Sequence, residues 1–272
     1  MNRRLQLLLH WLAGRRNGVS LPEIISVVFG RTCIPKAKSK IKSLEETENE
    51  IIVFFHDSAY PLYYPKKFPT WRLYQVIAET LYPNNWHYFE IDQTKVTKGD
   101  VVVDCGAAEG LFSLLAVPRC NQIYAIEPVP EFIQSMNRTF APFDNIEIIP
   151  VALSNEEGKS TITSSGISSR LTKTGEGRPV KVTTLDSLLM AKEQPIDYLK
   201  ADLEGHEMLM LKGAENLIKK YKPKIAITTY HGGQSATAIA DYLKELNPDY
   251  QIKFKGIENR AGAPVMLHAW TQ

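Results

Sequence analysis

A short stretch near the middle of the chain constrains the fold more than any other. Residues 101–103 are all valine, and such a β-branched run is typical of a parallel strand that is buried on both faces. The run ends at Asp104, and Gly106 and Gly110 follow it. These glycines allow the backbone to turn sharply and to approach a ligand where a Cβ atom would collide. A strand followed by a glycine turn indicates a nucleotide-type cofactor site.

A second apolar strand, predicted over residues 123–126, ends at Glu127. A carboxylate at this place can accept hydrogen bonds from both hydroxyl groups of a ribose. The sequence therefore predicts a cofactor that carries a ribose.

The spacing of the glycines distinguishes between the cofactors that carry one. A dinucleotide site requires G-x-G-x-x-G, whereas Asp104, Gly106 and Gly110 have the spacing D-x-G-x-x-x-G, the form found in methyltransferases that use S-adenosylmethionine. That cofactor has no phosphate groups, and Asp104 at the strand end suits the ammonium of its methionine part. A nicotinamide-dependent oxidoreductase is the alternative that the missing glycine argues against. A non-catalytic module that binds the cofactor is a second alternative.

Strand and helix patterns alternate from residue 100 onwards. Alternation of this kind predicts an α/β fold with a doubly wound, mostly parallel, Rossmann-like sheet. Two further strands near the end suggest an antiparallel pair at the sheet edge. The predicted strands are 100–104, 122–126, 145–149, 196–202, 224–229, 250–255 and 265–270, and the predicted helices are 109–117, 130–141, 206–220 and 235–246.

The first 85 residues form an extension ahead of a cofactor-binding domain at residues 86–272. Residues 1–17 predict a basic amphipathic helix that packs on its own domain, with membrane contact as the less favoured alternative. Residues 33–50 read as a solvated connector or an exposed helix. Residues 54–89 are rich in aromatic side chains, which either pack in the core or form a platform for a substrate. A polar stretch at 154–180 predicts a substrate lid that would bring Arg170 and Arg178.

Composition excludes several classes of function. The 272 residues carry a net charge of only +2, which gives no case for a nucleic-acid partner. The three cysteines have no C-x-x-C spacing and predict neither a disulfide framework nor a zinc site, so a reducing cytoplasm is expected.

The charged strand at 196–202 is the best candidate for chemistry. Lys200, Asp202 and Glu204 recur at every second position, although a buried parallel strand should be apolar, so they are either an ion-paired cluster or a functional site. His231 follows the next strand and would face Asp202 if the two strands are neighbours, where a histidine near its natural pKa could act as a base. Asp202, Glu204 and His231 could also bind a metal ion, but we assign none.

Several motifs taken together resemble the FkbM family of methyltransferases. The resemblance covers roughly residues 86 to 232, and its most specific part is the Lys-x-Asp-x-Glu-Gly block. The chain departs from the family pattern at Ala108-Glu109 in the glycine turn and at Thr229, where the family commonly has a glutamate. The matching motifs are Tyr88-Phe89-Glu90, Asp104-x-Gly106-Ala107-x-x-Gly110, Glu127-Pro128, Ala152-Leu153-Ser154, Thr184-Leu185-Asp186, Lys200-x-Asp202-x-Glu204-Gly205-x-Glu207 and Leu211-Lys212-Gly213-Ala214.

The resemblance implies an S-adenosylmethionine-dependent O-methyltransferase that acts on a hydroxyl of a small molecule, a sugar or a glycolipid. The expected cofactor-binding residues are Glu90, Asp104, Gly106, Ala107, Gly110, Glu127, Pro128 and Ala152. Those expected on the substrate side are Asp202, Glu204 and His231. Glu109, inside the glycine turn, has no role in this interpretation.

Overall fold

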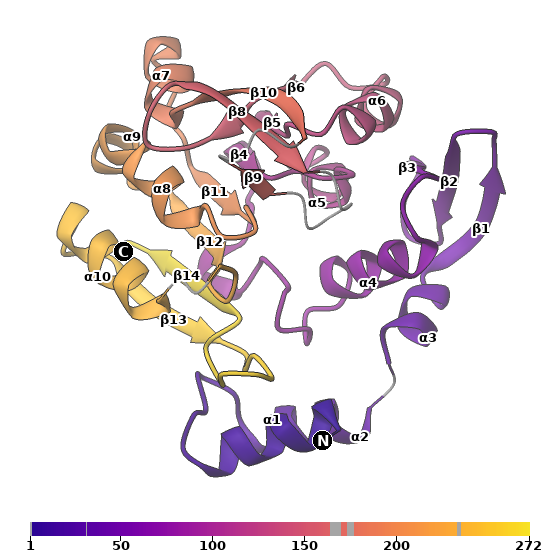
Figure 1. Cartoon of the computed structure of the whole chain (residues 1–272), viewed down its shortest axis with the longest axis vertical. Coiled ribbons are helices and arrows are strands. Elements are labelled where there is room, and N and C mark those ends of the chain that lie inside the picture. The colour runs from indigo at the N-terminus through magenta and orange to yellow at the C-terminus, as the bar shows by residue number, and fades with distance from the viewer. Residues whose placement is uncertain (1, 31, 164–169, 173–176, 233–234) are drawn as a thin grey trace.

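A computed structural model describes residues 2–30, 32–163, 170–172, 177–232 and 235–272. A seven-stranded sheet with helices on both faces dominates the molecule, and a three-stranded sheet lies beside it (Figure 1). The order of the large sheet is β13-β14-β12-β11-β4-β5-β6. Its bounds are β4 (Val101–Cys105), β5 (Gln122–Ile126), β6 (Ile146–Ile149), β11 (Tyr198–Ala201), β12 (Lys224–Thr228), β13 (Gln251–Lys255) and β14 (Met266–Trp270).

The pairing of these strands confirms the predicted doubly wound sheet. Strands β4, β5, β6, β11 and β12 are parallel to one another, and β14 pairs antiparallel with both β12 and β13. The last two strands therefore form the antiparallel pair expected at the sheet edge. Strands β11 and β12 are neighbours, which is the condition for bringing Asp202 and His231 together.

The valine run is apolar throughout because both of its faces are covered. Val102 belongs to the core under α4 (Thr70–Thr80), α5 (Leu111–Ala116) and α6 (Pro130–Thr139). Val101 and Val103 belong to the opposite core, under α7 (Leu185–Leu189), α8 (Glu207–Lys212), α9 (Glu215–Tyr221) and α10 (Ala236–Leu246). Alternate side chains of one strand thus reach opposite layers of helices. Short 3-10 helices, η1 (Asp92–Thr94) and η3 (Met190–Lys192), complete this part of the fold.

The single helix predicted at 206–220 is wrong, because the structure has two helices there. Helix α8 ends at Lys212 and α9 begins at Glu215. At Gly213 the backbone passes so close to residue 154 that a Cβ atom would lie 2.1 Å from the carbonyl oxygen of Ser154. This tertiary contact, which the helical periodicity does not record, interrupts the helix.

The N-terminal extension contains helices and a small sheet. The prediction of a connector or helix over residues 33–50 is wrong from residue 41 onwards, where strand β1 begins. Strand β1 is polar and largely exposed, and it forms because it pairs with the apolar, mostly buried β2. The bounds are α1 (Arg3–Leu12), α2 (Leu21–Phe29), α3 (Cys33–Lys38), β1 (Ile41–Glu46), β2 (Glu50–Phe55) and β3 (Leu62–Pro65).

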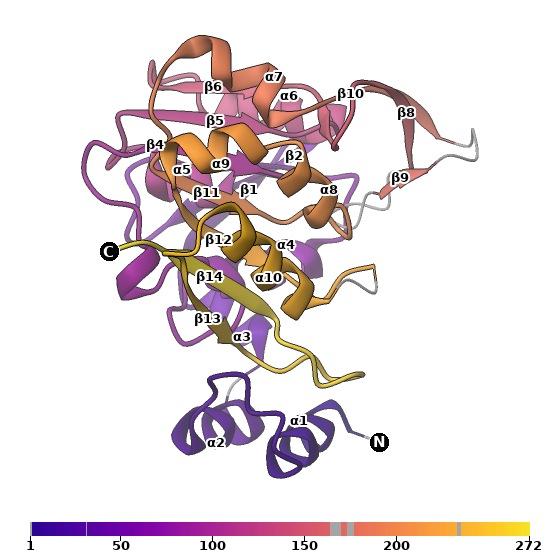
Figure 2. The same cartoon turned by 90° about the vertical axis from the view of Figure 1, so that its left-hand side faces the viewer.

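Helices α1 and α2 lie at one end of the molecule, next to the loop between β13 and β14 (Figure 2). Leu7 of α1 is buried, and the His10 ring lies 3.2 Å from the carbonyl oxygen of Asn259. Asn17 donates a hydrogen bond to the carbonyl of Gly262. The terminal helix therefore packs on its own chain, as predicted. In the described part of the chain, no helix has the length and apolar character needed to cross a bilayer.

The polar stretch at 154–180 contains strands of a second small sheet. Strands β7 (Ala152–Leu153), β8 (Gly158–Thr163), β9 (Arg170–Thr172) and β10 (Arg178–Thr183) are arranged in the order β7-β10-β8-β9. Arg178 forms an ion pair with Glu131. The predicted lid otherwise falls on residues 164–169 and 173–176, which lie outside the described residues, as does the side chain of Arg170.

Candidate functional site

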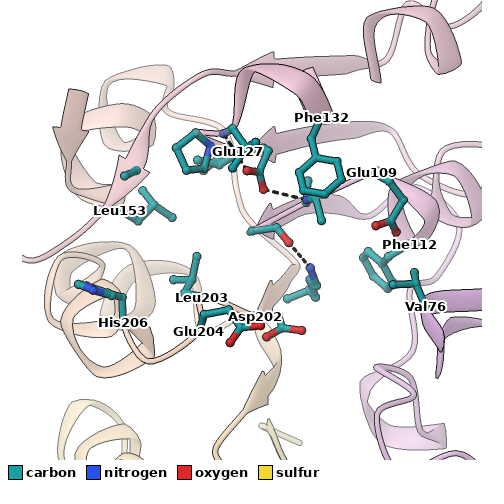
Figure 3. A pocket seen from close by; sticks show the side chains of 18 of the residues that line it. Val76, Glu109, Phe112, Glu127, Phe132, Leu153, Asp202, Leu203, Glu204 and His206 are labelled. Atoms are coloured by element: carbon teal, nitrogen blue, oxygen red, sulfur yellow. Dashed lines mark hydrogen bonds between the residues drawn. The ribbon is translucent and has the colours of Figure 1, made fainter. Parts of the chain in front are cut away.

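A pocket lies where the order of the sheet reverses. The chain runs outwards from β4 to β5 and β6, and then returns to the other side of β4 as β11 and β12. The carboxyl ends of neighbouring parallel strands diverge at such a point, and ligands of open α/β sheets bind there. The pocket is lined by the turn after β4, the end of β5, residues 151–153, the turn after β11 and one face of α4 (Figure 3).

The glycine turn has the backbone conformation that its spacing predicts. Gly106 has φ +75° and Gly110 has φ +85°, both in the left-handed region that favours glycine. A Cβ atom on Gly106 would lie 2.0 Å from the carbonyl oxygen of Asp202. Gly106 therefore lies where the turn after β4 and the turn after β11 approach each other most closely. Gly110 does not line the pocket, and a Cβ atom there would collide with the ring of Phe140 in the core.

Glu127 lies at the end of β5 with its carboxylate against the glycine turn. One carboxylate oxygen accepts a hydrogen bond from the backbone N–H of Ala108 and the other accepts one from Val129, both at 2.9 Å. The side chain is only 5% exposed, and burial raises its pKa to about 7, although the two backbone hydrogen bonds oppose this rise. Glu127 is thus fixed in place and faces the pocket, as a ribose-binding carboxylate should be.

Asp104 occupies a different place from the one expected. It is fully buried, does not line the pocket, and lies 2.8 Å from the ammonium of Lys200. Ser113 donates a hydrogen bond to its other oxygen. Lys200 also donates a hydrogen bond to the carbonyl of Gly106, so the ion pair of Asp104 and Lys200 stabilises the glycine turn. Asp104 therefore supports the turn, and its carboxylate pairs with Lys200 instead of facing the pocket where the cofactor ammonium was expected.

The other predicted cofactor residues divide into two groups. Ala107, Pro128 and Ala152 line the pocket, in the positions that the sequence suggested. Glu90 does not line it. Its carboxylate pairs with Arg119 at 3.0 Å and accepts a hydrogen bond from the backbone N–H of Val96. Glu90 therefore holds the chain that leads into β4, and the prediction of direct cofactor contact is wrong for this residue.

The predicted substrate-side residues come together at the ends of β11 and β12. The His231 ring lies 3.5 Å from carboxylate oxygens of both Asp202 and Glu204, and 3.4 Å from one of Glu207. The Thr228 hydroxyl lies 3.1 Å from a carboxylate oxygen of Asp202 and 3.1 Å from one of Glu207, and it can donate a hydrogen bond to either. Asp202 and Glu204 line the pocket, whereas His231 lies behind them. Glu204 has φ +52°, and backbone strain of this kind is common at functional sites.

His231 does not have the pKa that the sequence analysis assumed. Burial lowers the pKa of this imidazole, but Glu207, Asp202 and Glu204 together outweigh burial and raise it to about 9. The ring is therefore protonated near pH 7, and it is a cation held by three acids. The expectation of a pKa near the natural value is therefore wrong for His231, whereas its part in the reaction stays a prediction.

The same cluster includes a set of possible metal ligands. Donor atoms of Asp202, Glu207 and His231 lie within 4.8 Å of one another. Glu207, however, already accepts hydrogen bonds from the backbone N–H groups of Leu203 and Gly205. The contacts in the structure therefore form a charge network around His231, and the sequence analysis assigns no metal to it.

The sequence analysis did not predict that α4 and the residues that follow it form one side of the pocket. Val76, Glu79, His87 and Phe89 line the pocket from this side, so the aromatic-rich segment contributes mainly Phe89 and neighbouring polar groups. Burial raises the pKa of Glu79 to about 7 and lowers that of His87 to about 4. The aromatic composition signalled this segment, but no pattern in it indicated which side chains reach the pocket. Glu109 also lines the pocket.

Comparisons with known proteins agree with this site. A family model described as the methyltransferase FkbM domain matches residues 104–250. That range includes the glycine turn, Glu127 and the acidic cluster. A search of curated proteins finds no significant match.

Two solved structures share the fold. A methyltransferase FkbM from Methylobacillus flagellatus aligns with 98% of this chain and 59% of its own chain, at 16% identity and a TM-score of 0.55. This chain thus spans about three fifths of that protein. An S-adenosylmethionine-dependent methyltransferase from Agrobacterium tumefaciens aligns with 84% of this chain and 71% of its own, at 10% identity and a TM-score of 0.50.

Proposed function

This chain belongs to the FkbM methyltransferase family, and we propose that it transfers a methyl group to a hydroxyl of a small molecule, a sugar or a glycolipid. Its cofactor is S-adenosylmethionine. The observation that supports the proposal most directly is a pocket with two different walls. The cofactor wall consists of Gly106, Ala107 and Ala108, with Glu127 and the segment at 151–153. The acidic wall consists of Asp202 and Glu204, with His231 and Glu207 behind them.

The residues present fit this cofactor. At Gly106 the backbone makes a close approach that a Cβ atom would prevent. Glu127 offers carboxylate oxygens to the two ribose hydroxyls, and the apolar residues at 151–153 suit an adenine ring. The cofactor supplies an electrophilic methyl group on a positively charged sulfur.

Asp202 is the group we propose as the proton acceptor. Asp202 would hold the acceptor hydroxyl towards the methyl group that the cofactor supplies. Its carboxylate would take up the hydroxyl proton as the methyl group is transferred, with S-adenosylhomocysteine as the leaving product. His231 lies behind Asp202 as a cation, where it orients the carboxylate and balances the charge of its neighbours. We therefore infer that His231 is a positioning residue.

Incubation of the protein with ¹³C-methyl-labelled cofactor and a metabolite extract of its host tests the proposal. We expect label in a small molecule or glycolipid, with the chemical shift of a methoxy carbon in the NMR spectrum. Asp202→Asn should abolish labelling and leave S-adenosylhomocysteine binding unchanged. Label found only in protein or nucleic acid, or on a nitrogen atom, would contradict the proposed acceptor. A fully active Asp202→Asn variant would remove Asp202 from the mechanism.

A further inference from the structure

Glu109 is a buried acid in the pocket that the mechanism above does not use. We propose that its carboxylate binds the ammonium group of the methionine part of the cofactor. The proposal rests on the assignment of S-adenosylmethionine as the cofactor, and it gives a role to the residue at which this chain departs from the family motif.

The first support is the state of the carboxylate. Glu109 is only 3% exposed and lines the pocket. Within the part of the chain that the structure describes, its oxygen Oε2 is buried and has no hydrogen-bond partner. A buried, unpaired carboxylate oxygen is costly, so it is expected to acquire a donor when a ligand binds. Burial raises the pKa of Glu109 to about 7, although backbone hydrogen bonds and the charge of Lys200 oppose this rise.

The second support is the place of Glu109 along the pocket. Figure 3 shows Leu153 at one end, Glu127 in the middle and Glu109 towards the opposite end, beside Phe112 and Val76. The cofactor is itself linear, with adenine at one end, ribose in the middle and the aminocarboxypropyl chain at the other. With adenine at 151–153 and ribose at Glu127, that chain extends towards Glu109.

The third support is that the expected partner of the ammonium is already occupied. Asp104 is fully buried and paired with Lys200, so it offers no free charge to the pocket. Tyr64, whose hydroxyl is also buried, makes no hydrogen bond to Glu109. An ammonium group of the ligand would supply the donor that this Glu109 oxygen lacks among the described residues.

The test is calorimetric binding of three compounds to the full chain. S-adenosylhomocysteine carries the whole aminocarboxypropyl chain, its deaminated analogue lacks only the amino group, and 5′-methylthioadenosine lacks the aminocarboxyl end. Glu109→Gln keeps the shape of the side chain and removes its charge. We expect this variant to bind S-adenosylhomocysteine about tenfold or more weakly, the loss typical of a charged hydrogen bond. Its affinity for the other two compounds should change less than twofold.

A matched control is Glu50→Gln. Glu50 is another buried acid, but it lies on β2, forms an ion pair with Arg138 and does not line the pocket. We expect it to leave the affinities for all three compounds within twofold. A Glu109→Gln variant that binds S-adenosylhomocysteine normally, or weakens all three compounds equally, would overturn the inference. Failure of the unsubstituted protein to bind any of them would instead overturn the cofactor assignment and, with it, both proposals.

Discussion

The two walls of the pocket handle buried charge in opposite ways. On the cofactor wall, neither Glu109 nor Glu127 forms an ion pair with a described residue, and burial raises the pKa of each to about 7, although Lys200 opposes this rise. On the acidic wall, Asp202, Glu204 and Glu207 surround His231, and the carboxylates raise the pKa of the imidazole to about 9. The same fold thus contains acids without a counterion and acids that share one.

This difference indicates what each wall does. Acids that lack a counterion gain most from a ligand that brings donors or positive charge, which fits a wall that binds a cofactor. Acids that already share a cation are held in place before any ligand arrives, which fits a wall that must orient a reacting group. The predictions below alter one wall at a time.

The largest effect is expected at Lys200, which links the two walls. Lys200→Met would leave Asp104 fully buried without its cation and should lower the free energy of unfolding by about 3–5 kcal/mol. Urea denaturation measures this change. The control is Lys192→Met, which removes an exposed ion pair with Glu147 and should cost less than about 1 kcal/mol. Equal losses in the two variants would contradict a buried-charge explanation.

The next largest effect is expected at Gly106, where the walls approach most closely. Gly106→Ala combines an unfavourable positive φ with a clash against the Asp202 carbonyl, and should cost about 2–4 kcal/mol of stability. Gly99→Ala is the control, because Gly99 also has positive φ but has no atom within 4 Å of the added Cβ. It should cost only about 1–2 kcal/mol. If both variants lose the same stability, the clash with the Asp202 carbonyl does not contribute to the loss.

The fold was largely predictable because its strands carry the signal themselves. The runs at 101–103 and 123–126 are apolar on both faces, and the structure has strands at these positions. The failures lie where a distant contact decides the local structure. At Gly213 the approach of Ser154 ends a helix, and at β1 a polar segment becomes a strand only by pairing with β2.

The sequence predicted many residues of the site, but it did not predict which side chains contact one another. Residues 104 and 200 pair across neighbouring strands in the register Lys200↔Asp104, so their side chains share a face of the sheet. The sequence does not contain this register, and Asp104 was therefore assigned to the cofactor. Glu109 has no repeat or periodicity that marks it. Its proposed role follows from its burial and its place in the pocket, both of which depend on tertiary packing.

A smaller effect tests the cofactor wall directly. Glu127→Ala should weaken S-adenosylhomocysteine binding by about 2 kcal/mol, since it removes a charged acceptor for the ribose hydroxyls. Calorimetry at pH 8, where the carboxyl group is mostly ionised, measures the loss. The affinity for 5′-methylthioadenosine should fall by the same amount, because that compound keeps the ribose. An unchanged affinity would refute the ribose assignment.

An effect of similar size tests the acidic wall through its pH dependence. The pKa of His231 is raised from 6.5 to about 9 in the folded protein, so its protonation stabilises the fold fully below about pH 6.5. That contribution is lost as the pH rises through about 9. Between pH 7 and pH 9 the unsubstituted protein should lose about 2 kcal/mol more stability than His231→Asn. His87→Asn is the control: the pKa of His87 is lowered to about 4, so this ring is neutral throughout that range and its removal should leave the slope unchanged. Parallel stability curves for His231→Asn and the unsubstituted protein would mean that the carboxylates do not hold a cation at His231, and the contrast between the two walls would disappear.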